Sequence, residues 1–276
     1  MSQSATKSPS VGNILFGRRL ATAEAPHQTI SKTIGLAVFA SDALSSVAYA
    51  TQEILIILAV AGTAYFGLSI PISFVIIGLL IVLTISYRQT IYAYPGGGGA
   101  YIVSRDNLGD GAALTAGAAL LTDYILTVSV SISSGVAQIT SALPTFYPYR
   151  VEIALFLIAF ITIVNLRGVK ESGTVFAVPT YFFVFSMLVM LGLGFWQQST
   201  GQLATVTSVE TVEHALQPLT VLLLLKAFAS GCTALTGVEA ISNGIMAFKT
   251  PRSRNAAQTL IAMSMLLGIM FIGITV

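Results

Sequence analysis

Charged residues and cysteine are scarce in this sequence. Only 9% of its 276 residues are charged, whereas 55% are hydrophobic, and the mean hydropathy is +0.85. A soluble domain of this length would not stay in solution with such a balance, so the composition predicts a membrane protein. The single cysteine, Cys232, excludes an internal disulfide.

The sequence also lacks the residue patterns of metal and cofactor chemistry. The two histidines, His27 and His214, lie far apart, and no group of cysteines and histidines has the spacing of a transition-metal site. No nucleophile with an adjacent base supports an enzyme. We therefore expect no catalysis and no bound cofactor, and the net charge of +2 does not indicate a nucleic-acid partner.

Long apolar runs are abundant instead. Several exceed about 18 residues, the length that lets a helix cross a hydrocarbon core of about 30 Å, whereas a membrane barrel would show short alternating segments. The first 32 residues lack a short apolar core with a cleavage site behind it, so we expect a polar, cytoplasmic tail at 1–32. The last run ends without a polar flank, so we expect an incomplete transmembrane domain at 33–276. The predicted spans are residues 33–61, 69–92, 111–141, 151–167, 173–198, 218–247 and 256–276.

Basic residues are unevenly distributed between the connections. Lysine and arginine gather before the first predicted span and in the connections after the second, fourth and sixth spans. The connections after the first, third and fifth spans contain only one basic residue, Arg150. Because positively charged connections stay in the cytoplasm, this pattern predicts a multi-pass plasma-membrane protein whose N-terminus is cytoplasmic.

Two predicted spans have polar interruptions near their centres. In the first, the side chains from Ser41 to Ser46 compete with the helical backbone for hydrogen bonds. In the sixth, Gly231, Gly237 and two threonines surround Glu239. We expect a break in both helices, and breaks at matching positions of two halves indicate an inverted-repeat secondary transporter.

Three predicted spans each hold a carboxylate accompanied by hydroxyl side chains. A carboxylate at the centre of a bilayer costs at least about 2.5 kcal/mol, so its presence there indicates a function. Side-chain oxygens suit an alkali cation or a proton, and in the first and third spans they recur at helical spacing, which puts them on one face. The candidates are Asp42, Ser46, Tyr49 and Glu53 in the first span, Asp123, Tyr124, Thr127, Ser131 and Ser134 in the third, and Thr233, Thr236 and Glu239 in the sixth.

Other interpretations stay open for the weaker candidates. Each hydroxyl also has a structural interpretation, because Ser and Thr bond to the backbone and across helix contacts in membranes. Glu53 either pairs with Lys226 as an outer gate or faces solvent. Cys232 has no flanking base and is interpreted as a packing residue. The stretch YAYPGGGGAY, residues 92–101, lacks the flanking pattern of a nucleotide-binding loop and predicts a tight intracellular turn where backbones approach closely.

Several of these motifs resemble a known superfamily. YPGGGGAY and FASGCTALTGVEAISNGIMAFKTPRSRNAAQTL resemble the loop after the second helix and the sixth helix of the amino acid, polyamine and organocation (APC) transporters. ASDALSSVAYA and TDYILTVSVSISSG are similar to the KimA-type potassium importers, relatives of the KUP family. The likeness begins at about residue 11. It implies an all-α, LeuT-like fold of five-plus-five inverted repeats, of which this chain would hold the first repeat and helices six and seven.

The resemblance also implies a function. Such proteins are viewed as proton-coupled potassium symporters that form homodimers and carry a cytoplasmic regulatory domain able to bind a cyclic dinucleotide. Ser41 and Asp42 replace the glycine-rich break that holds a substrate carboxylate in ordinary amino acid permeases, which favours a cation, although an amino acid or polyamine permease stays the alternative. The residues carried over are Asp42, Tyr49, Asp123, Tyr124, Thr127, Ser131 and Thr236 as potassium ligands and Glu239 as the proton-coupling carboxylate.

Overall fold

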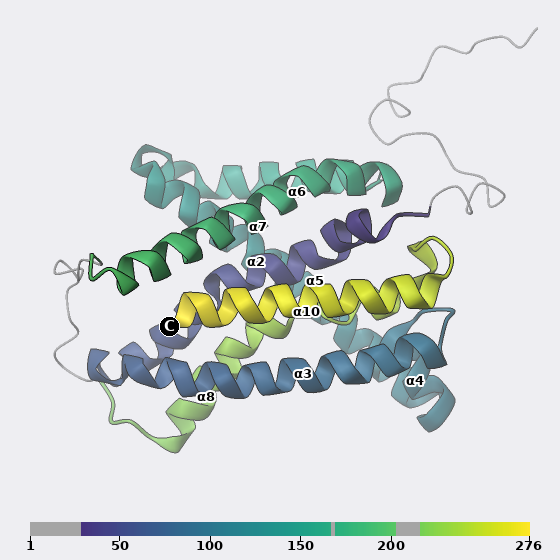
Figure 1. The fold of residues 1–276 in the computed structure, drawn as a ribbon, viewed down its shortest axis with the longest axis horizontal. Helices are drawn as coiled ribbons and strands as arrows, with labels where there is room; N and C mark the ends of the chain where they lie inside the picture. Colours follow the sequence, from purple (N-terminus) through teal and green to yellow (C-terminus); the bar gives the residue numbers. More distant parts are fainter. Residues whose placement is uncertain (1–28, 167–168, 203–215) are drawn as a thin grey trace, which may run out of the picture.

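The chain folds into a bundle of long helices (Figure 1). The computed structural model describes residues 29–166, 169–202 and 216–276, and within these ranges there is no β-strand apart from one bridge between Ile30 and Phe248. Six helices among the described residues are long and apolar enough to cross a membrane, as the composition predicts. They are built on α2 (Lys32–Ala59), α3 (Ser69–Ala93), α5 (Asp110–Ala142), α6 (Arg150–Leu166), α7 (Val169–Ser199) and α10 (Arg252–Thr275).

Helix α2 is the centre of the bundle. It packs against α7 and α10 and lies between them in Figure 1. The Ser31 hydroxyl caps its first turn by accepting from the Ile34 amide at 3.3 Å. Small side chains let the neighbouring backbones approach closely, and Ala37, Ala40 and Ala43 have no exposed surface.

The break predicted in the first span is wrong, because α2 runs without interruption through Ser41 to Ser46. The serine hydroxyls donate to carbonyls one turn back in the same helix. Ser41 bonds to the Val38 carbonyl at 3.1 Å, and Ser45 bonds to the Asp42 carbonyl at 2.8 Å. Bonds of this kind use carbonyls of the helix and leave its amides in place, so the polar run does not end the helix.

The break predicted in the sixth span is confirmed. This span divides into α8 (Val221–Gly231), η4 (Cys232–Leu235), α9 (Ala240–Asn243) and η5 (Ile245–Ala247). Between η4 and α9 the backbone is extended at Thr236, with φ −63° and ψ 145°, and left-handed at Gly237, with φ 78°. Only glycine adopts the latter conformation without a steric penalty, so Gly237 permits the interruption.

Three connections meet at one end of the bundle. The Ile30 amide donates to the Ala247 carbonyl at 2.8 Å, which joins the start of α2 to the end of η5. The Gly98 amide donates to the Asn243 carbonyl at 3.4 Å, which brings the glycine loop after α3 to the same place. The tight turn and close backbone approach expected of that loop are therefore present. The distribution of basic residues predicts that these three connections lie on the same side of the membrane, and their meeting agrees with this. That this side is the cytoplasmic one stays a prediction.

Short helices and open faces complete the bundle. The connecting helices are η2 (Thr63–Leu68), α4 (Gly99–Leu108) and η3 (Pro144–Tyr149). Helices α5, α6 and α7 expose large apolar side chains, among them Leu155 and Phe182 at 62% and 71%. Such faces suit contact with lipid, because hydrocarbon is as apolar as they are. Most of the predicted N-terminal tail, including His27, and the segment around His214 fall outside the described residues.

Candidate functional site

Three carboxylates gather where the broken sixth span meets α2 and α5. Asp42 of α2 interacts electrostatically with both Glu239, at the break, and Asp123 of α5. Glu239 is 7% exposed, and the two aspartates are half-buried. In the part of the chain that the structure describes, none of the three forms an ion pair, since the one such pair joins Arg105 to Asp110. The three acids would repel one another when ionised, and a cation or a proton among them would relieve that repulsion.

Gly237 brings the break into contact with Asp42. A Cβ atom at Gly237 would lie 2.9 Å from Oδ2 of Asp42 and 3.2 Å from the amide nitrogen of Ala43. Both distances are shorter than ordinary van der Waals contacts. Glycine is needed here for its backbone conformation and for its size, so the break and the α2 carboxylate form a single compact site.

A chain of hydroxyl groups connects the same three elements. Thr236 Oγ1 lies 3.0 Å from Ser46 Oγ, and Ser46 Oγ lies 3.1 Å from Tyr49 Oη. Tyr49 Oη in turn lies 3.3 Å from Ser131 Oγ on α5. The chain runs from the break across α2 to α5. It presents several neutral oxygens beside the three acids, and these are ligands that suit an alkali cation.

A second set of contacts surrounds Glu239. The Asn243 amide donates to the Tyr124 hydroxyl at 2.7 Å, and Tyr124 also interacts with the Glu239 carboxylate. Oε1 of Glu239 and Oδ1 of Asn243 are buried and have no hydrogen-bond partner among the described residues. Unpaired buried oxygens are costly, so this part of the site has capacity to accept a proton or a cation.

The predicted ligands thus come together from separate parts of the sequence. Asp42, Tyr49, Asp123, Tyr124, Ser131 and Thr236 all take part in the contacts described above, and Thr127 is buried on α5 one turn from Asp123. Glu53 and Lys226 form no ion pair in the described part of the chain; Glu53 is half-buried and Lys226 is exposed. Their role as an outer gate stays a prediction.

Three residues in or near the site are not among the ligands that the resemblance carried over. Ser46 lies on the predicted polar face of α2, but the resemblance did not carry it over as a ligand. Asn243 follows Glu239 by one helical turn, which puts both residues on one face. This spacing could have indicated that Asn243 belongs to the site. Tyr87 of α3 is half-buried and lies within electrostatic range of Glu239 and Asp123. Its local sequence, SYRQT, gives no indication of that proximity.

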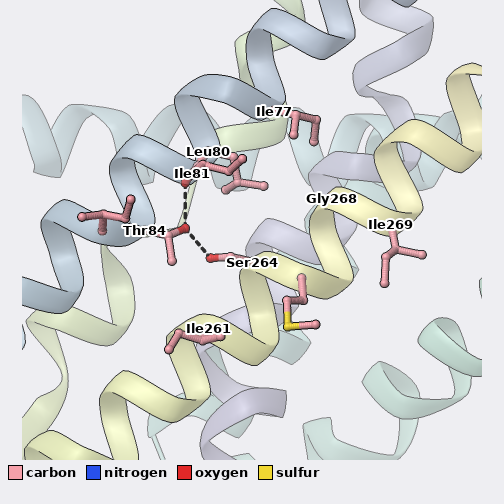
Figure 2. Close-up of a pocket in the computed structure, with 10 residues that line it drawn as sticks. Ile77, Leu80, Ile81, Thr84, Ile261, Ser264, Gly268 and Ile269 are labelled. Atoms are coloured by element: carbon pink, nitrogen blue, oxygen red, sulfur yellow. Dashed lines mark hydrogen bonds between the residues drawn. The ribbon is translucent and has the colours of Figure 1, made fainter.

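An apolar groove of about 380 Å³ lies elsewhere, between α3 and α10 (Figure 2). The Thr84 hydroxyl lies 2.7 Å from both the Leu80 carbonyl oxygen and the Ser264 hydroxyl, and the remaining lining is almost entirely aliphatic. Ile81 and Met265 on its rim are 55% and 61% exposed. The groove holds no charged side chain and shares no residue with the carboxylate cluster, so we do not assign the ion site to it.

A multi-span helical protein with acids at a helix break has the features of the membrane transporters built from discontinuous helices. Residues 30–276 match the family described as amino acid permease, and the chain belongs to this family. It is 52% identical over 267 residues to the protein named Potassium transporter KimA of Bacillus subtilis (strain 168). That alignment covers 97% of this chain and 44% of the relative, so the chain spans less than half the relative's length. The resemblance seen in the motifs is thereby confirmed.

Proposed function

We propose that this protein is a secondary active transporter that takes up potassium together with protons across the plasma membrane. The observation that supports it best is the cluster of Asp42, Asp123 and Glu239 at the helix break, with no ion pair to any of them among the described residues. An arrangement of mutually repelling acids is stabilised by a cation or by a proton. The adjoining hydroxyl chain supplies oxygens of the kind that replace the hydration shell of potassium.

The two transported species would use different groups. We assign potassium to the two aspartates and to the hydroxyls of Tyr49, Tyr124, Thr127, Ser131 and Thr236. We assign the proton to Glu239, which is the most buried of the three acids and lies two residues after Gly237. Burial favours the neutral form of a carboxylate, and a nearby cation favours the charged form. Binding of one species would therefore affect binding of the other through this side chain.

The relative and the family point to different substrates. The relative is named a potassium transporter and shares 52% of aligned residues with this chain, whereas the family is described as amino acid permease. The second candidate is thus an amino acid or polyamine permease. The Asp42 carboxylate, which would contact any Cβ at Gly237, argues against a substrate carboxylate at the break.

The wider architecture is proposed on the same basis. A five-plus-five inverted repeat would place the break of the sixth span at the substrate site, and rocking of one bundle against the other would open that site to each side in turn. The N-terminus would lie in the cytoplasm, and the protein would form a homodimer.

Uptake assays distinguish the two substrates. The protein expressed from its complete gene should restore growth of potassium-uptake-deficient cells at low external potassium. In proteoliposomes, an inward proton gradient should drive accumulation of radioactive rubidium, whereas labelled leucine, arginine and spermidine should not accumulate. Accumulation of any of these organic substrates without rubidium would contradict the proposal and support the permease.

A further inference from the structure

Asn243 lies where the broken sixth span meets α5 and the loop after α3. It ends α9, one helical turn after Glu239, and its side-chain amide donates to Tyr124 Oη at 2.7 Å. A phenol has one proton to donate, and here the amide already supplies a proton to its oxygen. The Tyr124 O–H is therefore left for another acceptor, and the Glu239 carboxylate interacts with it.

The glycine loop fixes the position of Asn243 from the other side. The Gly98 amide donates to the Asn243 carbonyl at 3.4 Å. A Cβ atom at Gly97 would lie 2.7 Å from the same carbonyl oxygen, and one at Gly99 would overlap Oδ1 of Asn243. Both glycines also have positive φ, of 81° and 44°. The loop therefore packs directly on Asn243, and the contact requires glycine at both positions.

We propose that Asn243 is a positioning residue of the cation and proton site. It holds Tyr124 with its hydroxyl toward Glu239, and it links the glycine loop at Gly97–Gly99 to that pair. A shift of the loop during transport would then move Asn243 and change how Tyr124 meets the carboxylate. This inference rests on the proposed function, because Glu239 and Tyr124 are assigned there to the proton and to potassium.

Replacement of Asn243 by Ala removes the amide donor, and Tyr124→Phe removes the acceptor of the same bond. Rubidium uptake should be measured in proteoliposomes, with protein from the complete gene, over a range of potassium concentrations and pH values. Asn243→Ala should lower the apparent affinity about fivefold, the change expected for loss of one hydrogen bond, and should shift the pH profile of uptake. Tyr124→Phe also removes a proposed potassium ligand and should lower the affinity at least as much. Because Asn243 acts through Tyr124, the double variant should be no weaker than Tyr124→Phe alone.

The chain offers a matched control. Asn107 Nδ2 donates to Tyr94 Oη at 3.2 Å, and this bond between the same residue types is exposed. Asn107→Ala should leave affinity and pH profile unchanged. If Asn243→Ala does not elute as folded protein, Asn243→Leu, which keeps the approximate size and removes the donor without adding a charge, should show the same shift.

Three outcomes would overturn the inference. Provided that the wild type takes up rubidium, unchanged affinity and pH profile in the Asn243 variants would overturn it. Single effects that multiply in the double variant would overturn it as well. If vesicles that contain the wild-type protein take up no rubidium, the proposed function is wrong, and this inference is wrong with it.

Discussion

The side-chain hydroxyls of Ser46 and Thr236 lie 3.0 Å apart although 190 positions separate them in the sequence. Ser46 is fully buried on α2, and Thr236 is the extended residue at the break of the sixth span. The same serine also contacts Tyr49 Oη at 3.1 Å. Ser46 thus joins the broken span to the hydroxyl chain that continues to α5.

Replacement of Ser46 by Ala should weaken potassium binding. It removes one of the two inner members of the hydroxyl chain and leaves Thr236 and Tyr49 without their shared partner. The loss of one buried hydrogen bond is worth about 1 kcal/mol, which corresponds to about a fivefold rise in the potassium concentration at half-maximal uptake. Ser45→Ala is the control, because the Ser45 hydroxyl bonds to the carbonyl of Asp42 in its own helix. A similar rise in both variants would contradict a special role of Ser46.

Replacement of Gly237 by Ala should impair both stability and transport. The left-handed backbone at φ 78° disfavours any side chain by about 1–2 kcal/mol, and the new Cβ would lie 2.9 Å from Asp42 Oδ2. Thermal unfolding in detergent and rubidium uptake measure the two effects. Gly192→Ala on α7 is the control, since a Cβ there meets no atom within 4 Å. Normal uptake by the Gly237 variant would show that the compact break is not required.

The spans were predictable because length and hydropathy alone determine which segments can cross a membrane. The prediction of 111–141, for example, corresponds to α5 at Asp110–Ala142. The break at Gly237 was also predictable, because a glycine among polar residues at mid-span permits a backbone that other residues resist. The serines of α2 show the limit of this reasoning. Composition does not reveal whether a hydroxyl competes with the helix or bonds to a carbonyl within it.

Contacts between distant segments were less accessible from the sequence. Each carboxylate was recognisable by itself, because an acid at membrane depth is rare. The bond from Asn243 to Tyr124, however, joins residues 119 positions apart, and it depends on how α9 is oriented after the break. Similarly, Tyr87 lies within electrostatic range of the acids, although its helix α3 has no acidic residue of its own. Local periodicity does not indicate which residues of distant segments lie close together in the fold.

Asp42→Asn and Asp123→Asn should each abolish potassium uptake. Each substitution removes one negative charge from the site while keeping the shape of the side chain. Membrane insertion should persist, because removal of a charge at membrane depth lowers a cost of about 2.5 kcal/mol or more. Asp110→Asn serves as the control, since that carboxylate is 86% exposed and forms a surface pair with Arg105. Wild-type uptake by either variant would exclude that aspartate as an essential ligand.

A cysteine placed at Thr250 should be labelled only from the cytoplasmic side. The connection at 249–255 holds three basic residues, which predicts a cytoplasmic location, and Thr250 is exposed. The native thiol should first be removed by Cys232→Ser. A cysteine at exposed Thr145, in the connection between α5 and α6, should instead react with an impermeant reagent added to intact cells. Labelling of position 250 from outside would reverse the proposed topology.

Glu239→Gln should separate potassium binding from the proton gradient. Gln has the shape of the protonated acid and cannot release a proton, so it fixes the site in its neutral form. Asp42 and Asp123 keep their charges in this variant, and some potassium binding should therefore persist. An inward proton gradient should accelerate rubidium uptake by the wild type, because outside acidification protonates the carrier and the cytoplasm accepts the proton. The same gradient should have no effect on the variant. Glu152→Gln on α6, at an exposed position, should respond like the wild type. If the Glu239 variant still accumulates rubidium when a proton gradient is imposed, another group carries the proton, and Glu239 is left with the structural role of a buried acceptor at the helix break.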